Sequence, residues 1–296
     1  MNFTTRLALV SLLTLPAYGL QAQQVYPTPD AAAHALVAAL GKQRADAQRM
    51  AQLLGADWQT YIPTDSIERQ DVDAFLALYK QKRQIHSDTA DQAHLVVGNN
   101  AWSFPLPLVK GQDGWYFDPK AGGEEIRARR IGRNELTTIE SLQAYDDAQM
   151  DYAEADRNGD GILEYAQQFI SSPGQHDGLY WDAEPGSAPS PLGPLFGDNA
   201  AGEDWHGYHY RILNAQGPSA PGGAYSYMLG KHMSRGFAAI AWPASYGDSG
   251  VMSFMISHDG QVYEKDLGPD GAKLASAMQR FDPDSSWKES DPVTTP

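Results

Sequence analysis

The sequence predicts an α+β protein: N-terminal helices on a small antiparallel sheet, then a long helix packed on a second antiparallel sheet. Three observations support this prediction. Helix-start signals precede residue 85, short β-rich segments separated by turns follow up to residue 117, and one long stretch with apolar residues three or four apart precedes a run of strands. We therefore expect two α+β domains, over residues 25–120 and 121–290.

The first helix is predicted from its capping residues. Thr28 supplies a capping hydroxyl, a proline follows at the first helical position, Asp30 lies in the first turn, and Gly41 ends the helix. The other elements expected in this domain are helices over 45–54 and 71–84 and strands over 94–97, 101–104 and 115–117. This order of elements resembles the cone-shaped NTF2-like domains.

The second domain is predicted to begin with a helix over residues 124–155, interrupted or bent near Gly132. Its apolar strip comprises Leu136, Ile139, Leu142, Tyr145, Gln149 and Tyr152. A short helix or turn is expected over 165–170. The predicted strands cover 208–213, 224–229, 237–242, 251–257 and 261–263, with a hairpin turn at Asp259-Gly260 and a final helix capped by Asp270.

Composition excludes several classes of function. The 296 residues carry a formal net charge of −15 and include no cysteine. Such an acidic chain repels nucleic acid and anionic lipid at long range, so no nucleic-acid partner is expected. Without cysteine there is no disulfide framework, no cysteine-based zinc site and no lipid anchored through a cysteine. A structural clip would be hydrophobic packing or a metal bound by oxygen ligands.

Residues 1–22 have the features of a secretory signal peptide. Arg6 supplies the positive charge, residues 7–15 form an apolar run, Pro16 ends it, and small residues permit cleavage after Ala22. The run is shorter than the ~20 residues that span a bilayer. We expect a periplasmic or secreted protein without a membrane span.

The most specific motif is an acidic loop over residues 156–164, called the acidic loop below. Oxygen ligands recur at every second position, Gly161 permits a sharp turn, and Leu163 is expected to anchor the loop to a core. The expected ligands of a bound ion are Asp156, Asn158, Asp160, the backbone carbonyl of Ile162, and Glu164 at position nine. The sequence thus predicts a Ca²⁺ site, with a solvated acidic turn as the alternative.

One position of the acidic loop departs from the EF-hand pattern. Position twelve, where EF-hands carry a bidentate glutamate, is Gln167, which lacks a charge and one oxygen. Further ligands could then come from Glu154 or Asp177. A Ca²⁺ affinity of roughly 10⁻⁴–10⁻³ M, typical of extracellular modules, is expected.

Two other groups of residues are candidates for ligand binding. Aromatic residues in and beside a segment rich in glycine, proline and serine form either a stacking platform for a glycan or peptide or the core of a long loop. Arg130 and Arg133 either clamp an anion or belong to a network of ion pairs. The aromatic candidates are Tyr180, Trp181, Trp205 and Tyr208.

A hydrolase is the alternative function. Ser249 lies in Gly-Asp-Ser-Gly, the tetrapeptide around the nucleophile of chymotrypsin-like proteases, but between two strands this tetrapeptide is also a natural turn. A carboxylate-type hydrolase would use Asp177 and Asp182 near Trp181. Because no complete catalytic set is recognisable, we expect a non-enzymatic binding or structural protein of the cell envelope, with a glycan or envelope protein as its partner.

Several blocks of sequence carry a resemblance to a known family. The chain resembles the bacterial domain-of-unknown-function family 2950 over about residues 25–288. The resemblance implies an exported protein and implies no activity. The blocks are WSFPLPLV (102–109), RRIGRNEL (129–136), DGLYW (177–181), SPLGPL (190–195), AAIAWPA (238–244) and KDLG (265–268).

The second half also resembles the globular part of type II secretion pseudopilins. The shared features are a helix, the DGLYW block, Gly207-Tyr208 leading a strand, and a closing hairpin at Asp259-Gly260. Major pseudopilins bind calcium, so this resemblance also implies a Ca²⁺ site. The chain differs from them by lacking the apolar N-terminal pilin helix and by carrying an additional N-terminal domain.

Overall fold

The chain forms two compact units. A computed structural model describes residues 23–62, 67–182, 189–193 and 204–291, and the predicted signal peptide lies outside these ranges. The division falls between Ile126 and Arg127. We call residues 23–126 the N-terminal unit and residues 127–291 the C-terminal unit. The 35-residue helix α4 (Pro119–Ala153) contains this boundary.

The N-terminal unit combines helices with a five-stranded antiparallel sheet in the order β1-β2-β4-β5, with β3 paired to β2. This confirms the predicted class and order of elements. The bounds are α1 Pro29–Leu40, α2 Ala47–Leu54, the 3₁₀ turn η1 Trp58–Thr60, α3 Arg69–Gln81, β1 Arg83–Ser87, β2 Gln92–Val97, β3 Trp102–Ser103, β4 Leu108–Lys110 and β5 Trp115–Phe117.

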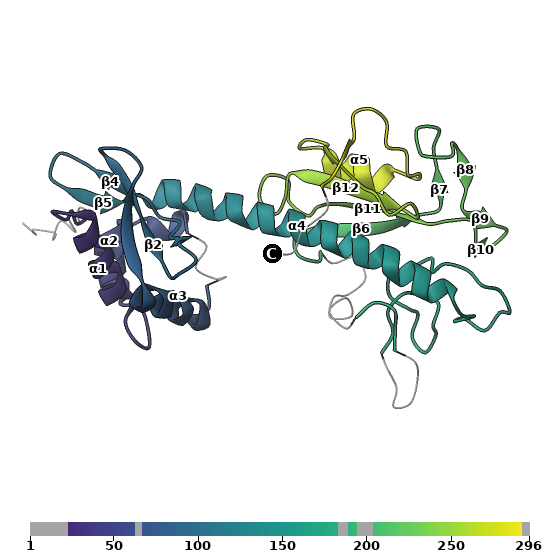
Figure 1. Ribbon diagram of the computed structural model, residues 1–296, viewed down its shortest axis with the longest axis horizontal. Helices are drawn as coiled ribbons and strands as arrows, with labels where there is room; N and C mark the ends of the chain where they lie inside the picture. Colours follow the sequence, from purple (N-terminus) through teal and green to yellow (C-terminus); the bar gives the residue numbers. More distant parts are fainter. Residues whose placement is uncertain (1–22, 63–66, 183–188, 194–203, 292–296) are drawn as a thin grey trace, which may run out of the picture. The chain divides into compact units, whose positions relative to one another are not determined.

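The helices of this unit lie against the sheet (Figure 1), α1 and α2 on β5 and α3 on β1 and β2. The predicted cap of α1 is confirmed, because the Thr28 hydroxyl accepts a hydrogen bond from the Ala31 amide. Strand β1 was not predicted, and the helix expected to reach residue 84 ends at Gln81. Only Ile85 of β1 is not fully exposed, so the strand lacks the apolar alternation that would reveal it.

The C-terminal unit is built on α4 and a five-stranded antiparallel sheet in the order β14-β13-β12-β11-β6. The long helix and the antiparallel sheet confirm the prediction, but the edge strand β14 was not predicted. Two short ribbons, β7–β8 and β9–β10, extend from it. The bounds are β6 Tyr208–Leu213, β7 Ala215–Gln216, β8 Tyr225–Ser226, β9 Met228–Leu229, β10 His232–Met233, β11 Ala238–Pro243, β12 Met252–Ser257, β13 Val262–Asp266, α5 Gly271–Ala277 and β14 Lys288–Glu289.

The core of the C-terminal unit lies around β11, all six residues of which are buried. Figure 1 shows α4 and α5 on opposite sides of this sheet. Tyr145 of α4 is fully buried and its hydroxyl donates to the Ala238 carbonyl of β11. Most of the predicted apolar strip is buried, but Leu136 is 52% exposed. The expected interruption near Gly132 is wrong, since α4 is continuous through that residue.

Two local predictions in the C-terminal unit are corrected. Residues 165–170 form no helix, and Ile170 makes an isolated parallel bridge with Tyr180. The strand expected over 224–229 is divided into β8 and β9 at Tyr227. The side chain of Tyr227 is fully buried, and its backbone amide donates to Asn214 rather than to a neighbouring strand of the main sheet.

None of the helices in the described ranges combines the length and the apolar character needed to cross a bilayer. Although α4 is 35 residues long, it carries charged side chains along its length.

Candidate metal centre

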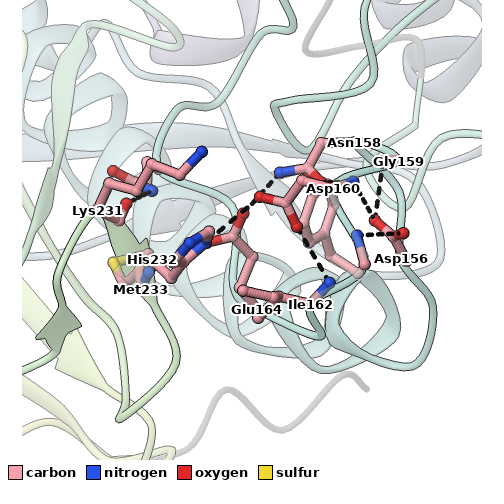
Figure 2. Close-up of polar contacts among 12 residues, drawn as sticks. Asp156, Asn158, Gly159, Asp160, Ile162, Glu164, Lys231, His232 and Met233 are labelled. Atoms are coloured by element: carbon pink, nitrogen blue, oxygen red, sulfur yellow. Dashed lines mark hydrogen bonds and ion pairs between the residues drawn. The ribbon is translucent and has the colours of Figure 1, made fainter.

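The acidic loop begins where α4 ends. The guanidinium of Arg157 donates to the backbone carbonyl and to the carboxylate of Asp151 in the last turn of the helix, both at 3.0 Å. Arg157 is the only basic residue of the acidic loop, and these contacts hold its side chain against the end of α4. The charge of Arg157 is therefore directed to the helix, and the carboxylate of Asp156 is turned to the amides of the loop (Figure 2).

The backbone of the loop is wound around Asp156. The Asp156 carboxylate accepts hydrogen bonds from the amides of Gly159, Asp160 and Gly161 at 2.8, 3.1 and 2.8 Å. Gly159 and Gly161 have φ of +76° and +87°, which side chains with a Cβ rarely adopt. The two glycines therefore allow three successive amides to converge on one carboxylate.

The next two ligand candidates each hold the backbone with one oxygen. The Asp160 amide donates to Oδ1 of Asn158, and the Ile162 amide donates to Oδ1 of Asp160, both at 3.1 Å. Asp160 retains Oδ2, which points away from the loop backbone toward His232. Asp160 thus both shapes the loop and directs an oxygen away from it, whereas the side-chain oxygens of Asp156 and Asn158 accept amides of the loop itself.

Glu164, at position nine, is the buried carboxylate of the loop. Its side chain is 7% exposed. It accepts hydrogen bonds from the side-chain amide of Asn158 at 2.6 Å and from the backbone amide of Met233 at 3.2 Å. Gln167, at position twelve, instead donates to the Lys231 carbonyl at 2.8 Å. The last carboxylate ligand of the loop is therefore Glu164 at position nine, since position twelve carries no acid.

His232 is the site residue that the sequence did not indicate. Its Nδ1 lies 3.2 Å from Oε2 of Glu164 and 3.3 Å from Oδ2 of Asp160. Figure 2 shows the three side chains turned toward one another. Ligand atoms of these three residues lie within 4.8 Å of one another. His232 comes from β10, 68 residues after Glu164, and a lone histidine at that separation gives no motif.

The expected anchor of the loop is corrected. Leu163 is 59% exposed and Ile162 is 40% exposed, so neither joins a core. The contacts to the rest of the unit are instead polar. The Tyr165 amide donates to the Met233 carbonyl at 2.8 Å, in addition to the bonds that Glu164 and Gln167 make to β10 and its turn.

A polar pocket of about 250 Å³ lies beside the loop. Burial, together with the negative charges of Glu164 and Asp177, raises the pKa of Tyr152 to about 12. Burial also raises the pKa of Asp177, but hydrogen bonds from Ser172 outweigh burial and hold this pKa below its ordinary value. The shift of Tyr152 reflects negative charge near the pocket, whereas that of Asp177 reflects the hydrogen bonds that stabilise its ionised form. The pocket is lined by Tyr152, Asn158, Glu164, Tyr165, Gln167, Gln168 and Asp177.

The aromatic candidates do not share one surface. Trp181 and Tyr208 are buried in the core of the C-terminal unit, and Tyr180 packs against that core while its hydroxyl donates to Asp182. Trp205 is half-buried and lines a cleft of about 610 Å³. The rest of the cleft consists of one face of α4 and a short segment, comprising Thr137, Glu140, Ser141, Ala144, Asp147, Ala148, Asp151, Pro191, Leu192, Gly193 and His206.

The Gly-Asp-Ser-Gly segment is part of a turn over residues 245–250, called the 245–250 turn below. The Ser249 hydroxyl accepts from the Ser245 amide at 3.0 Å and donates to the Ser245 carbonyl at 3.2 Å. Arg130 of α4 forms an ion pair with Asp248, whereas Arg133 is exposed. The structure thus gives Arg130 and Ser249 contacts that hold the turn, and it does not bring the two arginines together on one ligand.

The comparisons with known proteins show a family. Residues 23–290 match the family described as "Protein of unknown function (DUF2950)". No curated protein and no solved structure matches the chain. Because the family match covers nearly the whole described chain, this protein belongs to the DUF2950 family.

Proposed function

We propose that this protein is an exported, non-enzymatic component of the cell envelope whose acidic loop binds Ca²⁺ and is ordered by it. The buried carboxylate of Glu164 carries the proposal. A buried carboxylate is costly unless a cation or several hydrogen bonds compensate its charge. Among the described residues, no lysine or arginine pairs with Asp156, Asp160 or Glu164, and His232 contacts the last two. One imidazole cannot balance three carboxylates, so a divalent cation is the partner that we propose for them.

The ligand set fits calcium. Ca²⁺ takes six to eight oxygen ligands at about 2.3–2.6 Å from carboxylates, amide oxygens, backbone carbonyls and water. Asp156, Asn158, Asp160 and Glu164 offer side-chain oxygens, and Ile162 offers its carbonyl. Asn158 donates to Glu164, which holds these two candidate ligands side by side. One or two water molecules would complete the shell.

Location and architecture support the same proposal. The features of residues 1–22 indicate export, and a periplasmic or secreted protein meets far more free calcium than a cytosolic one. A long helix, an acidic loop and an antiparallel sheet follow one another in the C-terminal unit. This is the order on which the resemblance to the globular part of pseudopilins rests, and we propose that the shared feature is the calcium-ordered loop.

Calorimetric titration tests the calcium site directly. The untagged full chain, freed of metal with a chelator, is titrated with Ca²⁺ as wild type and as Asp156→Ala. We expect one site with a Kd of roughly 10⁻⁴–10⁻³ M in the wild type and no measurable heat in the variant. By mass action, Ca²⁺ at about 100 times Kd stabilises the wild type by about 2.7 kcal/mol, which thermal unfolding detects.

Asp248→Asn is the matched control for this titration. It removes one carboxylate from a loop of the same unit, but that carboxylate is already paired with Arg130. The calcium heat should therefore be the same as in the wild type. A folded wild type that gives neither heat nor a thermal shift would end the calcium proposal.

The cleft along α4 is the surface that we propose for the glycan or envelope-protein partner. The indole of Trp205 and two hydroxyls and three carboxylates of α4 line this cleft. Such a lining can bind a sugar, which has both an apolar face and hydrogen-bonding groups. Titration with soluble peptidoglycan fragments tests the glycan version. Binding should be lost in Trp205→Ala and kept in Trp102→Ala, which alters a tryptophan of the N-terminal unit. Absence of heat with the wild type would remove this version.

A further inference from the structure

A side-chain nitrogen of His232 lies close to two carboxylate oxygens of the acidic loop. Nδ1 of His232 is 3.2 Å from a Glu164 oxygen and 3.3 Å from an Asp160 oxygen. The three side chains come from two separate segments, the acidic loop and β10. Three atoms that can each donate an electron pair to a metal therefore converge. A proton on Nδ1 can form a linear hydrogen bond with only one of the two oxygens at a time. A cation between them would attract all three.

The separations fit a small divalent ion. Metal–nitrogen and metal–oxygen bonds of about 2.1 Å, at octahedral or tetrahedral angles, place neighbouring ligand atoms about 3.0–3.4 Å apart. The two distances from Nδ1 fall in this range. The side chains are also held in place, because Glu164 is 7% exposed, His232 is 18% exposed, and Glu164 accepts from Asn158 and Met233. The site is therefore organised by the fold around it.

The mixed nitrogen and oxygen ligands select the class of metal. Calcium and magnesium prefer oxygen ligands alone, whereas an imidazole suits zinc and the other late first-row divalent ions. We infer that Asp160, Glu164 and His232 form a binding site for a late first-row transition-metal ion such as Zn²⁺, with His232 contributing Nδ1 and water completing the shell. This inference depends on the proposed function only in that Asp160 and Glu164 are ligands in both the calcium site and the zinc site.

Such an ion would also join two parts of the unit. The β9–β10 ribbon has two residues in each strand. Besides the approach of His232 to Asp160 and Glu164, it is bonded to the acidic loop by Glu164 and to the residues just after the loop by Tyr165 and Gln167. A metal held by Asp160, Glu164 and His232 would add a direct link between the loop and β10. We therefore expect Zn²⁺ to protect the segment around residues 228–233 from proteolysis.

The control for this site is a pair of histidines in the N-terminal unit. His86 and His94 are opposite one another on β1 and β2, and Nδ1 of His94 lies 2.8 Å from Asp88. His86 and Asp88 are exposed. This cluster can bind Zn²⁺ at the surface without an organised site, so His94→Gln reports how much of the measured binding is unrelated to His232.

The experiment is a calorimetric titration of the untagged, metal-free full chain with Zn²⁺ and, separately, with Ca²⁺. We compare the wild type with His232→Gln, His94→Gln and Asp156→Asn, after circular dichroism has shown that each is folded. We expect one Zn²⁺ site that binds at least about tenfold more weakly in His232→Gln and within about twofold of the wild type in His94→Gln. Each tenfold change corresponds to about 1.4 kcal/mol.

The calcium titrations separate this inference from the proposed function. Asp156→Asn keeps an acceptor oxygen for the loop amides and removes the charge of a proposed calcium ligand. It should weaken Ca²⁺ binding at least about tenfold and leave Zn²⁺ binding within about threefold of the wild type, since Asp156 is not one of the three zinc ligands. If the wild type binds Zn²⁺ through His232 but gives no calcium heat, the calcium proposal falls and this inference stands. If Zn²⁺ binds equally well to the wild type and to His232→Gln, this inference falls whatever calcium does.

A second measurement covers the case in which His232→Gln does not fold. X-ray absorption of the zinc-loaded wild type, at one equivalent of metal, should show one imidazole and otherwise oxygen ligands. A shell of oxygens alone, or one with two or more imidazoles, would overturn the inference.

Discussion

The acidic loop and the 245–250 turn are two glycine-containing acidic segments of the same unit that are stabilised in different ways. In the 245–250 turn, Asp248 pairs with Arg130, and α4 supplies further contacts: Asn134 donates to the Ser249 carbonyl, and Glu135 accepts from two backbone amides. In the acidic loop, Asp156 accepts backbone amides, but no described lysine or arginine offsets the three carboxylates.

The difference shows why a short motif alone predicts little. Gly-Asp-Ser-Gly matches a protease tetrapeptide, yet every polar group of it discussed above is paired within the chain. The acidic loop deviates from the EF-hand pattern at position twelve, yet its buried Glu164 and nearby His232 leave a set of metal-ligating atoms together. What distinguishes the two segments is whether an arginine of the chain balances the carboxylate, as Arg130 does for Asp248.

The largest expected effect concerns packing under the 245–250 turn. A Cβ on Gly250 would collide with the hydroxyl of Tyr208, which is fully buried and donates to the Met252 carbonyl. We expect Gly250→Ala to lower the free energy of unfolding by about 3 kcal/mol, measured by urea unfolding. In the acidic loop, Gly159→Ala meets no atom within 4 Å and should cost only about 1 kcal/mol, from its positive φ. Equal costs would show that packing does not distinguish the two segments.

The next effect concerns the acceptor that α4 supplies to the turn. Oε1 of Glu135 accepts from the amides of Val251 and Met252 at 2.9 and 3.0 Å. Glu135→Ala leaves both amides without this acceptor and should lower the free energy of unfolding by about 2 kcal/mol. Glu135→Gln keeps an acceptor oxygen and should cost less than half as much. If the two variants unfold at the same urea concentration, the hydrogen bonds are not what holds the turn.

Much of the fold could be predicted from the sequence because its signals are local. The cap at Thr28, the periodic strip on α4 and the turn at Asp259-Gly260 each involve residues a few positions apart. Strand β1 could not be predicted, because its side chains are exposed and its partner strand defines it. The candidate site divides in the same way: the oxygens of the acidic loop follow from spacing, whereas His232 is brought to Glu164 by tertiary folding.

Asp146 of α4 offers a third case, a carboxylate with neither an arginine nor a metal-ligand set. Its Oδ1 is buried and makes no hydrogen bond within the described chain, and burial, with Asp147 and Asp259, raises its pKa to about 6. Because this pKa lies above the unfolded value, the ionised group destabilises the native state above about pH 6, and the loss is recovered as the pH falls toward 4.

Asp146→Asn should therefore stabilise the protein at pH 8 by about 1–2 kcal/mol and give almost no gain at pH 4. Chemical unfolding at both pH values measures this difference. A gain that is the same at pH 4 and pH 8 would mean that the ionised carboxylate is not its source.

The smallest expected effect is the dependence of stability on salt, which should have opposite signs in the acidic loop and in the 245–250 turn. Without metal, the carboxylates of the acidic loop repel one another, so raising NaCl from about 0.02 to about 0.5 M should stabilise this loop by screening. The partly exposed pair of Arg130 and Asp248 should instead be weakened. In chelator, Asp160→Asn should reduce the stabilising response and Asp248→Asn should increase it, each by about 0.5 kcal/mol in thermal unfolding. Responses of the same sign would contradict the contrast.

The 68-residue separation between Glu164 and His232 has a consequence for how the chain matures. Closing so long a segment costs entropy, so the two side chains do not meet in an unfolded polypeptide. An ion that requires both can bind only after the hairpin bearing His232 has docked. For a polypeptide that crosses a membrane unfolded and folds on the far side, occupancy of this site would mark the molecules that have finished folding.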